Sequence, residues 1–311
     1  MDLLQIILVF VLATVGTTVL GLISRWIDRK VTARIQWRVG PPWFQPFADV
    51  FKLLGKETLV PATARKWTCL MAPAIGFAGT ALAASILWTA NLASSGFTGD
   101  LIVVVYLLTM PSLAIILGGI SSGNPVAALG ASREMKLVFA YELPFILALV
   151  AVILRAGATS GETFKFAGIL AAQHSEGMVI ASASGVIAFI VAILCAQAKL
   201  GLVPFDMPEA ETEIMSGPFL EYSGAPLAVV YLMKSLLLAT LPILFITLFW
   251  GGVGPGWGYL WAALAYVLIL VLFVLIRNTN PRLRIDQAVK FFWFGLTPLA
   301  ILAVLLAAYG L

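Results

Sequence analysis

The chain has 311 residues, of which 61% are hydrophobic and 11% are charged. Soluble domains carry about 25% charged residues, so this composition excludes an ordinary soluble protein and places the chain in a membrane. The net charge of +4 comes from basic residues spread over loops between apolar runs, next to anionic lipid headgroups, which excludes a nucleic-acid-binding protein.

Eight apolar runs follow one another along the chain, each near the ~20 residues that cross a bilayer as a helix. They cover residues 3–24, 67–90, 101–120, 136–154, 178–198, 225–249, 257–276 and 289–309. No gap between them can hold a soluble domain. The sequence therefore predicts an all-α, polytopic membrane protein with about eight transmembrane helices in a single transmembrane domain, residues 1–311.

The basic residues predict the orientation of these spans. An even number of spans puts both termini on one side of the membrane. With the N-terminus outside, sixteen of the nineteen Lys and Arg residues lie inside, Arg155 and Lys165 lie outside, and Lys234 falls within a span. The positive-inside rule thus predicts that both termini are outside in a multi-pass protein of the cytoplasmic membrane.

The longest polar segment, residues 25–66, follows the first span. Gly40-Pro41-Pro42 predicts a turn within it, because proline fixes φ and glycine permits tight geometry. Residues 47–56 then alternate apolar and charged side chains at helical spacing, which predicts a short amphipathic helix on the inner surface. An ordinary interfacial anchor would show the same pattern.

Two charged residues lie deep inside predicted spans, where each costs on the order of 2–3 kcal/mol unless it faces protein or water. Glu142 lies a third of the way into the fourth span and is a candidate proton carrier. Lys234 lies ten residues into the sixth span, ~15 Å deep, and is a candidate for a proton relay or a structural ion pair. For Glu134, we expect a surface pair with Arg133 or Lys136.

A second polar stretch, residues 204–221, contains five carboxylates among apolar residues. Glu209 and Glu213 are four residues apart, so one helical turn would place them side by side. Close carboxylates in a poorly solvated place do not all ionise, and their protonation is coupled. The interleaved apolar residues predict that the stretch is buried against a partner or a cavity wall. The five acidic residues are Asp206, Glu209, Glu211, Glu213 and Glu221.

Metal chemistry is not expected within this chain. Cys69 and Cys195 are far apart, and there is a single histidine. This set of residues cannot make an iron–sulfur or zinc site, so any metal is expected in a partner protein.

Five motifs in order along the chain carry a resemblance to a known family. They are the Gly-Pro-Pro…Gln-Pro…Ala-Asp…Lys-Leu-Leu-Gly-Lys-Glu run at 40–57, Tyr-Glu at 141–142, Pro-Phe-Asp-Met-Pro-Glu-Ala-Glu at 204–211, Glu-Tyr-Ser-Gly at 221–224 and Pro-Arg-Leu-Arg-Ile-Asp-Gln at 281–287. Together they resemble the eight-helix heel subunit shared by respiratory complex I and energy-converting membrane-bound NiFe hydrogenases, over almost the whole chain.

The loop after Pro42 separates the branches of that family. Quinone-reducing relatives carry a longer, glycine-rich insert there, whereas Pro42 is followed here directly by Trp43-Phe44-Gln45-Pro46. The short version resembles the hydrogenase branch, and the membrane-bound sulfane reductases share it. The short loop therefore argues against a quinone site.

The resemblance implies a subunit without redox metals of its own. A peripheral Fe-S subunit and a large NiFe-type catalytic subunit would dock on its cytoplasmic face, carrying the NiFe centre and Fe-S clusters, with lipid and antiporter-like membrane subunits alongside. The implied proton-transfer and coupling residues are Glu142, Asp206, Glu209, Glu211, Glu213, Glu221 and Lys234. The implied partner-docking residues are Arg38, Asp49, Lys52, Lys56, Glu57, Arg282, Arg284 and Asp286.

The expected function is that of a membrane anchor and coupling subunit in a proton-reducing, ion-translocating hydrogenase. This subunit would not itself turn over substrate. The alternatives are the equivalent subunit of a sulfane reductase or of a quinone-reducing complex I, a stand-alone secondary transporter, and a purely structural anchor. The sequence leaves open whether H⁺ or Na⁺ is the pumped ion.

Overall fold

The computed structural model describes residues 3–93, 95–160, 164–254 and 256–311. This part of the chain is helical and contains no strand, as the composition predicts. Seven helical stretches within it are long and apolar enough to cross a membrane. They are α1 (Leu3–Ile35), α3 (Lys66–Ala93), α4 with α5 (Asp100–Leu107 and Met110–Ser121), α6 (Pro125–Ser160), α10 (Gly224–Phe249), α11 (Trp257–Thr279) and the stretch from α12 (Ile285–Lys290) through a π-helical turn (Phe291–Leu296) to α13 (Thr297–Ala308).

The fifth predicted span is shorter than the sequence suggests. A 3-10 turn, Val179–Ala181, precedes helix α8 (Ala183–Lys199), which has 17 residues. The Ser182 hydroxyl accepts a hydrogen bond of 3.0 Å from the Gly185 amide and so caps the start of α8. The eight predicted spans therefore correspond to seven long apolar stretches and one shorter apolar helix within the described residues.

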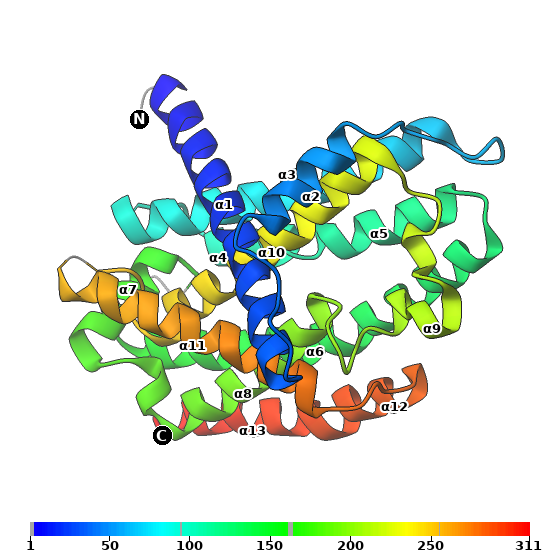
Figure 1. The fold of residues 1–311 in the computed structure, drawn as a ribbon. Helices are drawn as coiled ribbons and strands as arrows, with labels where there is room; N and C mark the ends of the chain where they lie inside the picture. The colour runs from blue at the N-terminus through cyan, green and yellow to red at the C-terminus, as the bar shows by residue number, and fades with distance from the viewer. Residues whose placement is uncertain (1–2, 94, 161–163, 255) are drawn as a thin grey trace.

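Helix α10 forms the centre of the bundle. It packs against α1, α3 and α11, and most of its residues from Ser235 to Phe249 are fully buried. Helix α1 crosses this bundle at a steep angle (Figure 1). With 33 residues it is ~50 Å long, whereas the hydrocarbon core of a bilayer is ~30 Å thick. Its second half thus brings polar residues to the inner ends of α10 and α11.

The two ends of the bundle differ in character. Helices α9 (Glu211–Ile214) and α12 lie at one end, and α7 (Phe166–Glu176) and the start of α11 lie at the other (Figure 1). The predicted amphipathic helix is confirmed as α2 (Gln45–Leu54), which packs on α1 and α10. Val50 is buried, but Phe51 is 72% exposed. The apolar face of α2 is therefore only partly covered by the rest of the chain.

Candidate proton-coupling site

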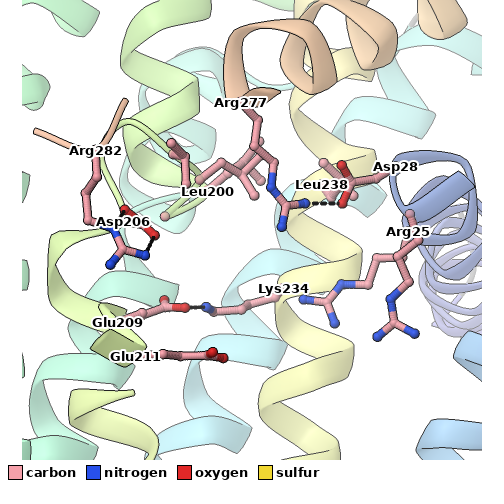
Figure 2. Close-up of a pocket in the computed structure, with 14 residues that line it drawn as sticks. Arg25, Asp28, Leu200, Asp206, Glu209, Glu211, Lys234, Leu238, Arg277 and Arg282 are labelled. Atoms are coloured by element: carbon pink, nitrogen blue, oxygen red, sulfur yellow. Dashed lines mark hydrogen bonds and ion pairs between the residues drawn. The ribbon is translucent and has the colours of Figure 1, made fainter. Parts of the chain in front are cut away.

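A charged cavity of about 530 Å³ opens between the inner ends of α1, α10 and α11 and the segment after α8. Nine of its fourteen lining residues are charged. These nine are Arg25, Asp28, Arg29, Asp206, Glu209, Glu211, Lys234, Arg277 and Arg282. The charged side chains labelled in Figure 2 extend into the cavity from these separate elements.

The acidic segment, defined here as residues 206–213, forms one wall of this cavity. It consists of a 3-10 turn, Met207–Glu209, and the start of α9, separated by a break at Ala210 with φ −57° and ψ 99°. Met207 of this segment and the preceding Phe205 are buried, but Met215 after it is 71% exposed, so the predicted burial of the apolar residues is confirmed only in part. The predicted pairing of Glu209 and Glu213 on one helical turn is wrong, because the break at Ala210 sends them to different partners.

Two of these partners lie on helices of the bundle. Glu209 pairs with Lys234 of α10, and Glu213 pairs with Arg133 of α6 at 2.6 Å. Arg133 also donates a hydrogen bond of 3.3 Å to the Met207 carbonyl. Each carboxylate thus joins the acidic segment to a separate span, and the deep lysine has the acidic partner that its burial requires.

The third partner lies just before α12. Arg282 holds Asp206 through two parallel hydrogen bonds, from Nε to Oδ1 at 2.8 Å and from Nη2 to Oδ2 at 2.5 Å. Hydrogen bonding to Asp206 raises the pKa of the Arg282 guanidinium above its usual range. This planar, two-bond geometry fixes orientation as well as distance, so Asp206 anchors the start of the acidic segment.

A second charged pair lies deeper, between α6 and α8. Lys199 Nζ lies 3.1 Å from Glu142 Oε2, and the Lys199 side chain is 0% exposed. The rings of Tyr141 and Phe145 have their centroids 5.1 Å and 5.2 Å from Lys199 Nζ. Sequence reasoning found Glu142 but counted Lys199 as an inner-loop cation. The apolar residues that follow Lys199 are the signal that it is not in water.

Glu134 links these two charged groups. It is 4% exposed, contacts the Ser112 hydroxyl, and lies close enough to Glu209, Lys234 and Lys199 to interact with their charges. The expected surface pair with Arg133 or Lys136 is wrong. Helix α6 begins at Pro125, well before the predicted span, so Glu134 lies within the helix on its inward face.

The remaining predicted coupling residues lie at the edge of the site. Glu221 accepts a hydrogen bond of 2.6 Å from the Asn124 side-chain amide, and Asn124 Oδ1 accepts one of 2.9 Å from the Val126 amide at the start of α6. Glu211 lines the cavity, and no ion pair involves it within the described residues. It is the acidic residue of the segment that is free to respond to a charge outside the chain.

The predicted docking residues divide into two groups, and of the eight Arg282 lines the cavity itself. Asp49 pairs with Arg29 at 2.9 Å, and Arg282 holds Asp206. The other six are exposed: Arg38, Lys52, Lys56, Glu57, Arg284 and Asp286. In the part of the chain that the structure describes, no three His, Cys, Asp or Glu side chains come together as a metal site.

The fold and the buried charges define a polytopic membrane protein with ion-paired groups inside its bundle. The family model described as NADH dehydrogenase matches residues 5–308. An NADH-quinone oxidoreductase subunit of Thermomicrobium roseum is 36% identical, covering 92% of this chain and 90% of that protein. The corresponding protein of Syntrophotalea carbinolica is 34% identical, covering 97% and 96%.

A solved structure extends the likeness to the fold. A chain of the membrane-bound sulfane sulfur reductase, an archaeal respiratory membrane complex, matches with a TM-score of 0.87 at 30% identity, covering 97% of this chain and 99% of that one. The chain therefore belongs to the NADH dehydrogenase family, as the motifs indicate, and is a complex I-like membrane subunit.

Proposed function

We propose that this chain is the membrane anchor and coupling subunit of a redox-driven ion pump, in which electron transfer in docked peripheral subunits drives translocation of H⁺ or Na⁺. The finer proposal is a proton-reducing NiFe hydrogenase, as the short loop after Pro42 suggests. The NiFe centre and Fe-S clusters would reside in the partners, and antiporter-like subunits would continue the ion path.

One observation carries this proposal: the surface-facing acidic segment is ion-paired to the same helices that hold the buried ionisable groups. Helix α10 supplies Lys234 to Glu209, and helix α6 carries both Arg133 and Glu142. A charge that appears in a docked partner above the cavity would act first on Glu211 and the segment. The paired groups would respond next, because charges at these short distances interact strongly.

The ionisable groups of the chain lie at increasing depth from the cavity into the bundle, as a path for a proton requires. Glu209 and Lys234 border the cavity, Glu134 lies between, and Glu142 with Lys199 lies deepest. Loosening of the Glu209–Lys234 pair would leave Lys234 without its acid inside the bundle, where an unpaired charge is costly. Glu134 is placed to accept a proton passed inward from this pair, and Glu142 to carry it onward into the bundle.

The sulfane reductase branch is a second candidate, favoured by the structural match over nearly the full length of both chains. A quinone-reducing role is supported by the similarity to NADH-quinone oxidoreductase subunits. The cavity argues against a quinone as its occupant here, because nine charged residues line it whereas sites for such ligands are mostly apolar.

Replacement of Glu142 by Gln tests the coupling role. The assembled complex should form, and ion uptake into inverted membrane vesicles per electron transferred should fall or turnover should stop. Glu176→Gln is the matched control, since Glu176 is exposed at the opposite end of the bundle, and it should pump normally. Unchanged ion gradients in Glu142→Gln would remove Glu142 from the path.

Purification of the chain with its companions from native membranes distinguishes the branches. Nickel with iron, and hydrogen evolution from a reduced donor, would support the hydrogenase. Iron without nickel would point to the sulfane reductase or quinone branch and leave the coupling role intact. A chain that purifies alone and transports ions in liposomes would refute the coupling proposal in favour of a stand-alone transporter.

A further inference from the structure

A second large hollow lies at the other end of the bundle, far from the charged cavity. Its volume is about 650 Å³, and it is bounded by the end of α7, the glycine-rich turn at 250–254 and the first half of α11. Helix α7 and the start of α11 lie at the end of the bundle opposite the acidic segment (Figure 1). The groove therefore faces the other membrane leaflet.

One wall of the groove is apolar and follows α11 into the bilayer. Gly258, Trp261, Ala262, Ala265 and Leu268 line it and recur at the spacing of one helix face. From residue 258 to residue 268 the helix rises ~15 Å. The glycine and the two alanines form the bottom of the groove, and Trp261 and Leu268 form its sides. The shape of this wall suits one extended hydrocarbon chain.

The groove has free space beside Gly258, at the start of α11. A Cβ atom added at Gly258 would have no atom of the described residues within 4 Å. A side chain introduced there would therefore enter the groove itself without displacing any part of the protein.

The end of the groove near the membrane surface is polar and carries hydrogen-bond acceptors. Gln173 is 5% exposed, and its Nε2 donates to the Thr247 carbonyl at 3.1 Å, but its Oε1 has no hydrogen-bond partner in the part of the chain that the structure describes. A buried acceptor without a donor costs about 1–3 kcal/mol. The site is therefore incomplete until something supplies a donor.

His174 adds a second acceptor beside Gln173. Its Nδ1 lies 2.6 Å from the Leu170 carbonyl oxygen, and a carbonyl can only accept, so Nδ1 carries the hydrogen. In the neutral ring Nε2 is then an acceptor. Among the described residues that line the groove there is no Lys or Arg, so these residues do not favour a purely anionic headgroup.

We propose that this groove binds a membrane lipid whose headgroup donates hydrogen bonds, with one hydrocarbon chain lying along α11. A primary ammonium headgroup meets both acceptors, and a headgroup with free hydroxyls offers the same donor chemistry. His174 is exposed and offers Nε2 as the first contact. The buried Gln173 Oε1 is the second contact, and its side chain must rotate toward the groove to meet the donor. Trp250 and Trp261 line the same groove, at the depth where tryptophan favours the membrane interface.

Competition between matched lipids tests this proposal on the purified, delipidated full chain by native mass spectrometry. Phosphatidylethanolamine and phosphatidylcholine with identical acyl chains share net charge, but the choline headgroup has no donor. We expect roughly tenfold preference for the ethanolamine lipid, the effect of one hydrogen bond from a charged donor. Phosphatidylglycerol in a second competition distinguishes hydroxyl donors from the ammonium.

Two glycine variants separate the groove from other lipid contacts. Gly258→Leu should abolish the preference while the fold is retained, since leucine also favours helix over glycine. Gly16→Leu is the matched control. A Cβ at Gly16 also meets no atom of the described residues within 4 Å, but Gly16 lines a different apolar groove, between α1 and α3. It should leave the preference unchanged.

Three results would overturn the proposal. They are equal binding of the two zwitterionic lipids, a preference that survives Gly258→Leu, and a crosslink from residue 258 to another subunit in the native complex. The last result would mean that protein, not lipid, fills the groove.

Discussion

Lys199→Met isolates the deepest charged pair of the protein. This substitution removes the ammonium but keeps a long apolar side chain, and so leaves Glu142 without its partner. The two charged atoms lie 3.1 Å apart, and the Lys199 side chain is 0% exposed. At an effective dielectric constant of about 20, their attraction is about 5 kcal/mol.

The loss in stability should be close to that attraction. Removing one member of a buried pair typically costs about 3–5 kcal/mol, because the other charge stays buried and uncompensated. Replacing both members usually restores most of the loss. We therefore expect Lys199→Met to lower the free energy of unfolding by about 3–5 kcal/mol, and Lys199→Met combined with Glu142→Gln to recover most of it.

A double-mutant cycle measures this coupling directly. The wild type, the two single variants and the double variant are unfolded reversibly with SDS in mixed micelles, and their free energies are compared. A loss below about 1 kcal/mol for Lys199→Met, or simple additivity in the double variant, would refute the pair. The double variant should also fold normally but fail to pump, which separates the structural role of the pair from its coupling role.

Two further predictions concern the inner surface. Arg282→Ala should raise amide hydrogen exchange in the acidic segment roughly fivefold, since a partly exposed two-bond pair with Asp206 contributes about 1 kcal/mol. The control variant Arg284→Ala should leave this exchange unchanged. Equal exchange in the two variants would contradict the anchoring role of Arg282. The Tyr222 hydroxyl donates to the Cys69 carbonyl at 2.8 Å, and Tyr222→Phe should lower the free energy of unfolding by about 1 kcal/mol. Burial raises the pKa of Tyr222, so this tyrosine stays protonated below about pH 10 in both the folded and the unfolded protein. The loss of unfolding free energy in Tyr222→Phe should therefore be the same at pH 6 and pH 9, and a difference between them would count against this hydrogen bond.

The membrane architecture could be predicted from the sequence because it depends on local composition. A run of apolar residues must form a helix in lipid, whatever its neighbours are, and α2 shows its amphipathic spacing within ten residues. The limits of α8 could not be predicted in this way. Residues 178–182 are as apolar as a helix start, and only the cap at Ser182 shows that the helix begins later.

The charged pairs could be predicted only in part, because partners come from distant segments. The depth of Glu142 and Lys234 in their spans showed that each needed a partner, but not which one. Glu134 was misinterpreted because its fate depends on where α6 begins. Lys199 was missed because the segment after it folds back over the bundle instead of entering water.

The three anchors of the acidic segment have a consequence for how it can be released. Asp206, Glu209 and Glu213 are held by bases from three different parts of the chain. When one pair opens, the other two keep its carboxylate at a high effective concentration beside its base, so it closes again. Small fluctuations therefore leave the segment in place, and only a perturbation that weakens several anchors together frees it. Triple tethering gives the response a threshold that no single ion pair could provide.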